Sequence, residues 1–351
     1  MNDFINVLVV DDSALMRRML GDILSSDPRI RVVGVAKDGM ECLAKIRQLS
    51  PDVVTLDVEM PNKDGLATLE EIMKTNPIPV VMVSSLTQEG AQITLKALAI
   101  GCVDFVVKPS GSISVNIKEV GAELISKVVA AKGARIRPVG VPAYRSPAPQ
   151  GLGTPVYKKE KRDIIAIAAS TGGPMALQQL LSNLPENIPV PIVITQHMPK
   201  DFTASFAKRL DSVSKLTVLE AEEGMDLKPG HAYIAPGGSH LVVKRRANKM
   251  PYCGLSDAPP VLSVKPSANI MFYSVVDEFG GNVVVVILTG MGRDGADGAV
   301  GLHAKGAYII AESQESCIVY GMPKAAVEAG IVDELLPLTD IPYALLRSVK
   351  G

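Results

Sequence analysis

The sequence has no long apolar run and no leader-like start. None of its apolar stretches approaches the roughly 18 residues that a membrane-spanning helix needs. The first six residues carry Asp3 where a secretory signal would place lysine. These two absences predict a cytoplasmic protein with no membrane insertion.

Cysteine is scarce and scattered. The chain has four cysteines and no C-x-x-C pair: Cys42, Cys102, Cys253 and Cys317. This spacing argues against both a disulfide framework and a zinc site. We expect the four side chains to be buried and to have no chemical role.

What is present fits a two-domain globular protein. The 351 residues are enough for two domains of roughly 100–200 residues each. Basic residues concentrate in the stretch 131–162, where Glu160 is the only acid and proline recurs at positions 138, 142, 147, 149 and 155. This composition predicts an extended linker over 131–160 between a first domain, 1–130, and a second, 161–351. No aromatic stacking pattern or helix-turn-helix accompanies the basic residues, so no nucleic-acid partner is expected.

The first domain alternates short apolar runs with helical patterns. The run "INVLVV" at 5–10 is followed by apolar residues at helical spacing, and the same succession recurs four more times up to about residue 130. Such alternation predicts an α/β fold with a doubly wound, five-stranded parallel sheet.

Polar side chains stand where these strands end. Asp11 and Asp12 follow the first strand, and Asp57, Ser84 and Lys108 follow the third, fourth and fifth. The carboxyl ends of such strands share one edge, where carboxylates repel one another unless a hard cation such as Mg²⁺ lies among them. The pattern predicts a Mg²⁺ site and places Asp57 to accept a phosphoryl group, whose oxygens Ser84 and Lys108 can bind.

Residues 1 to about 125 resemble a response-regulator receiver domain, with its flavodoxin-like fold, because DD, D, S and KP occur in the receiver order. The resemblance implies that Asp57 is the phosphoacceptor, that a histidine kinase is the phosphodonor, and that Phe105 is the aromatic residue that changes rotamer.

The resemblance also implies the metal ligands. Asp12 and Asp57 would bind Mg²⁺ directly, Asp11 through water, and Glu59 through its main-chain carbonyl. Taken singly, each carboxylate could instead be a helix cap or a solvated loop charge.

The second domain again alternates apolar runs and helical patterns, which predicts a second, mostly parallel α/β domain. The runs expected as strands are 163–170, 190–196, 215–222, 231–237, 240–246 and 282–290.

Ser170 stands where the first of these runs meets a helix that has Pro174 in its first turn. Ser170 or Thr171 could simply cap this helix. A phosphate-binding loop is disfavoured, because the stretch lacks both G-K-[ST] and a full G-x-G-x-x-G. As a nucleophile, Ser170 would need a base, a group that orients the base, and donors for an oxyanion.

Four histidines are candidates for the base. His197 follows an apolar run, so it shares the edge of Ser170 if the two strands are parallel neighbours. His231 precedes a strand, which predicts the opposite edge, and His303 lies in a helical pattern. His240 is the strongest competitor because it too lies in a glycine-rich loop, although at a strand start.

For the orienting carboxylate, the glycine-rich exit of the run 282–290 carries Asp294, with Asp297 behind it. Asp294 is favoured because it lies nearer the strand end. Alternatively, Asp294 could cap a helix that begins near Gly295. We expect the stretch 265–279 to be ordinary for the region before this strand.

The order Ser, His, Asp differs from the familiar orders of serine hydrolases, and "AASTG" is not G-x-S-x-G. However, "ASTGGP", "QHMP", "APGG" and "LTGMGRDGADG" closely resemble the CheB-type protein-glutamate methylesterase domain across residues 160–348. That family joins this domain to a receiver. The resemblance implies that Ser170 is the nucleophile, His197 the base and Asp294 its partner.

The resemblance further implies that Thr171 and the Met291 backbone N–H contribute to orientation or to the oxyanion hole. The implied substrates are methyl-accepting chemotaxis receptors, whose glutamyl γ-methyl esters are hydrolysed and whose selected glutamines are deamidated, without a cofactor for the esterase. The unphosphorylated receiver is expected to restrain this activity. A binding module without turnover is the alternative, and a transcription factor is disfavoured because no DNA-reading helix is evident.

Overall fold

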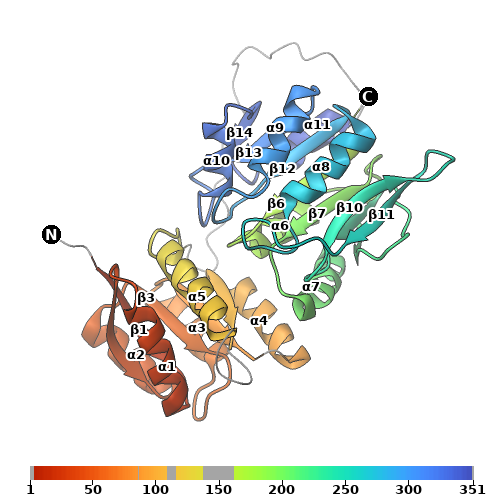
Figure 1. The fold of residues 1–351 in the computed structure, drawn as a ribbon. Coiled ribbons are helices and arrows are strands. Elements are labelled where there is room, and N and C mark those ends of the chain that lie inside the picture. Colours follow the sequence, from red (N-terminus) through yellow and green to blue (C-terminus); the bar gives the residue numbers. More distant parts are fainter. Residues whose placement is uncertain (1–3, 86, 109–115, 137–161, 350–351) are drawn as a thin grey trace. The chain divides into compact units, whose positions relative to one another are not determined.

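The computed structural model describes residues 4–85, 87–108, 116–136 and 162–349 (Figure 1). The chain divides into two compact units, Met1–Val141 and Pro142–Gly351. Most of the predicted linker lies outside the described residues.

The first unit is a five-stranded sheet in the order β2-β1-β3-β4-β5, and each neighbouring pair is parallel. This confirms the predicted fold class and strand number. Its elements are β1 (Ile5–Val10), α1 (Ala14–Ser25), β2 (Ile30–Ala36), α2 (Gly39–Leu49), β3 (Val53–Asp57), α3 (Gly65–Thr75), β4 (Val80–Ser84), α4 (Gln88–Ile100), β5 (Asp104–Val107) and α5 (Asn116–Lys132).

Local sequence sets where the helices of this unit begin. Four helices are preceded by a side chain whose oxygen accepts a backbone N–H of the first turn: Ser13 before α1, Asp38 before α2, Asp64 before α3 and Thr87 before α4. Such caps satisfy N–H groups that have no partner inside the helix. They fix each loop between a strand end and the following helix, which is where the polar side chains lie.

The second unit contains a seven-stranded sheet in the order β14-β13-β12-β6-β7-β9-β8, again parallel at each pair, and a separate antiparallel hairpin, β10–β11. The mostly parallel α/β prediction is confirmed. The elements are β6 (Ile164–Ala169), α6 (Gly173–Ser182), β7 (Ile192–Gln196), α7 (Lys200–Val213), β8 (Thr217–Glu220), β9 (His231–Ile234), β10 (His240–Arg245), β11 (Pro251–Ser256), α8 (Ala268–Phe279), β12 (Val283–Ile287), α9 (Ala296–Ala304), β13 (Tyr308–Glu312), α10 (Met322–Glu328), β14 (Glu334–Leu336) and α11 (Ile341–Val349).

The centre of this sheet is entirely apolar. Every residue of β6 and β12 is buried, as expected for strands covered on both faces. Because β6 lies between β12 and β7, the carboxyl ends of these three strands are neighbours. The loops after them can therefore bring three distant parts of the sequence to one place.

The four cysteines all lie in the described part of the chain, where they are buried and form no disulfide, as predicted. Burial raises the pKa of the Cys42 and Cys253 thiols to about 12, which leaves both groups protonated and unreactive at neutral pH. No helix in the described part of the chain combines the length and the apolar character needed to span a lipid bilayer.

Candidate functional site

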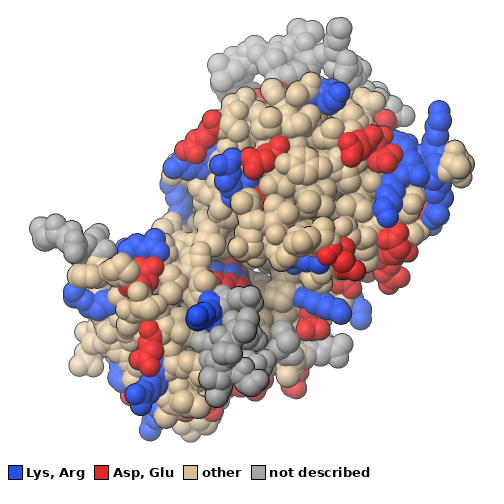
Figure 2. Space-filling model, in the orientation of Figure 1, with Lys and Arg blue, Asp and Glu red and all other residues tan. Residues whose placement is uncertain are grey.

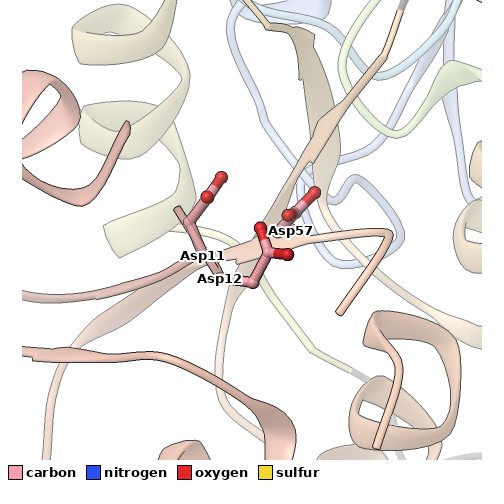
Figure 3. A group of neighbouring side chains, drawn as sticks. All are labelled: Asp11, Asp12 and Asp57. Carbon is pink, nitrogen blue, oxygen red and sulfur yellow. The ribbon is translucent and has the colours of Figure 1, made fainter. Parts of the chain in front are cut away.

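The first candidate site lies at the carboxyl edge of the receiver-like sheet. Asp11 and Asp12 follow β1, Asp57 ends β3, and one carboxylate oxygen from each lies within 4.8 Å of the others (Figure 3). Lys108 Nζ lies 3.0 Å from Asp11 Oδ2 and 2.7 Å from Asp57 Oδ2. The structure thus brings together the four charged groups that the sequence placed at this edge.

Burial dominates the electrostatics of this edge. It raises the pKa of Asp57 to about 6; the Lys108 ammonium opposes this rise, and the nearby Asp11 carboxylate adds to it. Burial would lower the pKa of Lys108, but its contacts with Asp57 and Asp11 raise it. Apart from the ammonium, neither buried Oδ2 atom has a hydrogen-bond partner among the described residues. Hard carboxylate oxygens in need of positive charge fit Mg²⁺.

The other predicted receiver residues surround Asp57. The backbone N–H of Glu59 donates to Asp57 Oδ1 at 3.3 Å. Ser84 ends β4, and its buried hydroxyl accepts a hydrogen bond of 2.8 Å from Thr94. Phe105 is buried within β5. Their functional roles stay predictions.

The second candidate site lies where β6, β7 and β12 end. Ala169 pairs with Gln196 across β6 and β7, and the next backbone N–H, that of His197, donates to Ala169 O. Ser170 and His197 are therefore neighbours on one edge. On the other side, the Ser170 N–H donates to Thr289 O at 3.1 Å, which joins β6 to the loop after β12.

That loop brings Asp294 to His197. The His197 Nε2 atom lies 2.8 Å from Asp294 Oδ2. A carboxylate can only accept, so Nε2 carries the hydrogen and Nδ1 is the nitrogen that remains for a proton from Ser170. Within the described residues, the Ser170 hydroxyl forms no hydrogen bond; contacts between nucleophile and base often tighten only when substrate binds.

Asp294 is buried, but several protein groups donate hydrogen bonds to its carboxylate. Burial would raise its pKa, but hydrogen bonds from His197, Ser267 and Ala268 lower it below the ordinary value. The alternative that Asp294 caps the following helix is wrong, because α9 is preceded by Gly295 and has no side-chain cap. The carboxylate accepts instead from the first residues of α8.

The alternative that Ser170 or Thr171 caps α6 is also wrong. The cap position belongs to Gly172, whose φ of 78° lies in the left-handed region that favours glycine. A Cβ atom at this position would lie 2.7 Å from the side chain of Ile318. The glycine allows a tight turn and leaves the Ser170 hydroxyl without a structural task.

The stretch 265–279 was expected to be ordinary chain, and this is wrong, because it supplies donors to Asp294. The sequence also gave no indication of Gln196, whose Nε2 donates to the carbonyls of Ser170 (3.0 Å) and His197 (3.1 Å). Gln196 is the polar residue that ends the buried strand β7, and that position could have marked it.

The remaining histidines lie where their sequence positions indicate, and none replaces His197. His231 begins β9 on the opposite edge, and His303 lies in α9. His240 is fully buried at the start of β10; its Nδ1 accepts from the Ser267 N–H at 3.0 Å and its Nε2 lies 3.2 Å from Pro259 O. Both of its nitrogens are occupied, so His240 is not available as the base.

The loop after β12 also carries Met291. At Gly290, just before it, a Cβ atom would lie 2.8 Å from Ser170 Cβ, so this loop passes directly against the nucleophile candidate. Thr171 follows Ser170 and is buried. The positions of Thr171 and Met291 are compatible with their predicted oxyanion roles, which stay predictions.

Two family models match the chain. The CheB methylesterase model matches residues 165–345, and the response regulator receiver domain model matches residues 7–116. Together they cover both sheet edges described above.

Curated relatives that match nearly the whole chain are named as the same enzyme. The chain is 47% identical to the protein-glutamate methylesterase/protein-glutamine glutaminase of Pyrococcus horikoshii, over 99% of this chain and 94% of the relative. It is also 47% identical to protein-glutamate methylesterase/protein-glutamine glutaminase 1 of Syntrophomonas wolfei, over 97% and 98% of the two chains.

A solved structure agrees for the second unit. The crystal structure of the Thermotoga maritima CheB methylesterase catalytic domain aligns with a TM-score of 0.52 and 43% identity, covering 53% of this chain and 98% of that one. The resemblance found in the sequence is thereby confirmed. The chain belongs to the CheB methylesterase family and carries that family's catalytic domain behind a response regulator receiver domain.

Proposed function

We propose that this chain is a protein-glutamate methylesterase that hydrolyses glutamyl γ-methyl esters of chemotaxis receptors and deamidates selected receptor glutamines. The observation that carries the proposal is the 2.8 Å contact between His197 Nε2 and Asp294 Oδ2, on the edge where Ser170 is the neighbour of His197. The names of the full-length relatives support the same activity.

The arrangement supports a two-step ester hydrolysis. The Ser170 hydroxyl attacks the ester carbonyl while His197 Nδ1 takes its proton; the same proton then goes to the departing methoxide, which leaves as methanol. Water opens the acyl-enzyme, with His197 acting again as base. Asp294 stays ionised throughout and stabilises the imidazolium, in agreement with its lowered pKa.

The start of α6 supplies the electrostatic complement. Ser170 lies two residues before Gly172, the cap of this helix, whose N-terminal end carries partial positive charge. The backbone N–H groups of Thr171 and Met291 are proposed as donors to the oxyanion. An amide substrate follows the same course, with ammonia in place of methanol.

The receiver is proposed to be phosphorylated on Asp57 by a chemotaxis histidine kinase. Mg²⁺ would be held by Asp12 and Asp57, by Asp11 through water, and by the Glu59 carbonyl. When bound, the ion neutralises charge on the transferring phosphoryl oxygens.

The protein's own groups complete this site. Lys108 and Ser84 are proposed to bind the phosphoryl oxygens, and Phe105 to change rotamer with phosphorylation. Lys108 already lies at ion-pair distance from Asp57, which supports its part in this assignment.

Regulation is proposed to act between a receiver domain at 1–130 and a catalytic domain at 161–351, joined by a linker at 131–160, in a cytoplasmic protein. Phosphorylation would shift an equilibrium in which the receiver restrains the esterase. Removal of residues 1–150 is expected to raise basal methanol release. An unchanged or lower rate in a folded second domain would contradict this regulatory proposal.

The face of the molecule drawn in Figure 2 favours a protein substrate over a nucleic acid. Figure 2 shows Lys and Arg side chains interspersed with Asp and Glu over this face. On the hairpin β10–β11, Arg246 pairs with Asp226 at 2.8 Å and Arg245 approaches Glu278 at 3.7 Å. Basic groups that already have acidic partners are poorly placed to bind a phosphate backbone.

The activity is tested by measuring methanol release from methylated receptors, with and without a small phosphodonor. Release is expected in both conditions and should be faster with the donor. The Ser170→Ala variant should fold and accept phosphate on its receiver but release no methanol. Appreciable release by this variant would remove Ser170 from the mechanism.

A further inference from the structure

The carboxylate of Asp294 is held by hydrogen bonds from the cap residue and the first two residues of α8. Its Oδ1 accepts from Ser267 Oγ at 2.7 Å and from the Asn269 N–H at 3.2 Å. Its Oδ2 accepts from the Ala268 N–H at 2.6 Å and from His197 Nε2 at 2.8 Å. Each oxygen therefore has two donors, and the buried carboxylate cannot rotate without breaking hydrogen bonds.

The hold is reciprocal. The side-chain oxygen of Asn269 accepts the N–H groups of Gly295 and Gly298, at 3.0 and 2.8 Å, at the start of α9. Asp294 thus accepts backbone N–H groups at the start of α8, while Asn269 accepts backbone N–H groups at the start of α9. These reciprocal hydrogen bonds fix the backbone of both helix starts, so that the Ser267 hydroxyl is held in place against Asp294.

Ser267 is itself fixed by a buried histidine. The N–H of Ser267 donates to His240 Nδ1 at 3.0 Å, and His240 Nε2 lies 3.2 Å from Pro259 O. Accepting at one nitrogen and donating at the other requires a neutral imidazole with its hydrogen on Nε2. Both Ser267 and His240 are fully buried. A chain of hydrogen bonds thus runs from His240 through Ser267 and Asp294 to His197.

We propose that Ser267, whose N–H donates to His240, is a positioning residue that orients Asp294 Oδ2 toward His197. The proposal rests on the hydrolytic function proposed above and names a residue that acts through Asp294 without touching the substrate. Without the hydroxyl, Oδ1 keeps only the longer Asn269 contact, and the carboxylate can turn away from the imidazole. A poorly aimed carboxylate no longer selects the tautomer that leaves Nδ1 free.

The test is Ser267→Ala in the full-length chain, assayed for methanol release from methylated receptors. The expected result is a fall in kcat of about 10- to 100-fold with KM within about twofold, because the ester-binding surface is untouched. The downfield proton signal of the His197 N–H bound to Asp294 should weaken or shift. A merely structural serine would not change this signal.

Ser274→Ala is the matched control, since it removes a serine hydroxyl from α8, the helix that Ser267 immediately precedes. Ser274 Oγ accepts from the Val243 N–H at 2.9 Å and donates to Met271 O at 2.7 Å, away from Asp294. This variant should lose thermal stability yet keep kcat and the His197 signal. If both variants lose kcat in proportion to melting temperature, the role of Ser267 is structural and the proposal is overturned.

Ser267→Cys provides a second route if the alanine variant does not fold, since a thiol is similar in size but a weak donor. An intermediate kcat supports the proposal, and a kcat equal to that of the parent overturns it. Failure of the function itself is distinct, because the parent chain would then release no methanol or Ser170→Ala would retain the activity.

Discussion

At the carboxyl edge of the first sheet, the pKa of Asp57 is raised to about 6, whereas at the corresponding edge of the second sheet the pKa of Asp294 lies below its ordinary value. Both carboxylates are buried and both follow or end a parallel strand. The same architecture therefore produces opposite electrostatics.

The difference lies in the donors around each carboxylate. Asp294 accepts from a hydroxyl, two backbone N–H groups and His197. Asp57 has one long N–H contact and the Lys108 ammonium, which it shares with Asp11. The second edge has all the donors its anion needs, while the first depends on positive charge from outside, which suits a site for Mg²⁺ and a phosphoryl group.

The largest expected effect is that of Ser170→Ala, which should lower methanol release by about 10⁴-fold or more. Incorporation of phosphate from a small phosphodonor should stay within about twofold of the parent, because the two edges belong to separate units. If the variant also loses phosphorylation, the two sites are not independent and the comparison fails.

Asp294→Asn is expected to lower kcat by about 10³- to 10⁴-fold. An amide at this position can donate to the imidazole and favours the tautomer with its hydrogen on Nδ1, the nitrogen needed as base. Rates of receptor demethylation measure the effect. A loss below about tenfold would mean that His197 does not depend on the charge of Asp294.

Gln196→Leu is expected to lower kcat by about tenfold, since two hydrogen bonds that join the loops of Ser170 and His197 are lost. Receptor demethylation by this variant should show the loss in kcat rather than in KM. Gln179→Leu, on a partly buried side of α6, is a control of the same size change and should keep its kcat. Equal kcat values for Gln196→Leu and Gln179→Leu would argue against a catalytic contribution of these two hydrogen bonds.

The smallest expected effect is on stability. Because the pKa of Asp57 is raised, the folded receiver binds its proton more tightly than the unfolded chain. The stability that this bound proton gives the folded receiver is complete below about pH 4 and is lost as pH rises through about 6. In Mg²⁺-free buffer, Asp57→Asn should therefore stabilise the receiver by about 1–3 kcal/mol at pH 8 and by less at pH 5.

Calorimetric unfolding of the full chain at the two pH values checks this expectation. A variant that is less stable than the parent at pH 8 would show that Lys108 outweighs both burial and the repulsion from Asp11.

The sequence predicted the strand-end residues well because each parallel strand has a simple sequence pattern. An apolar run followed by a polar residue and a helical pattern predicted the places of Asp57, Ser170 and His197. The donors to Asp294 were missed for a physical reason. Two of them are backbone N–H groups, which every residue except proline carries, and the third is the hydroxyl of Ser267 just before α8, where no local motif marks it.

His240 shows the limit of reading a residue by its type. Its glycine-rich setting resembles that of a catalytic base, and only its two hydrogen-bond partners reveal a supporting position. Those partners come from the loop after β11 and the start of α8, so no local pattern could have identified them.

The most direct test of the central claim is covalent labelling of the full-length chain with a serine-reactive fluorophosphonate, mapped by peptide mass. The account predicts a label on Ser170 that is absent from Ser170→Ala and forms much more slowly when His197 or Asp294 is replaced. A label on another residue, or methanol release from a chain whose Ser170 cannot be labelled, would contradict it.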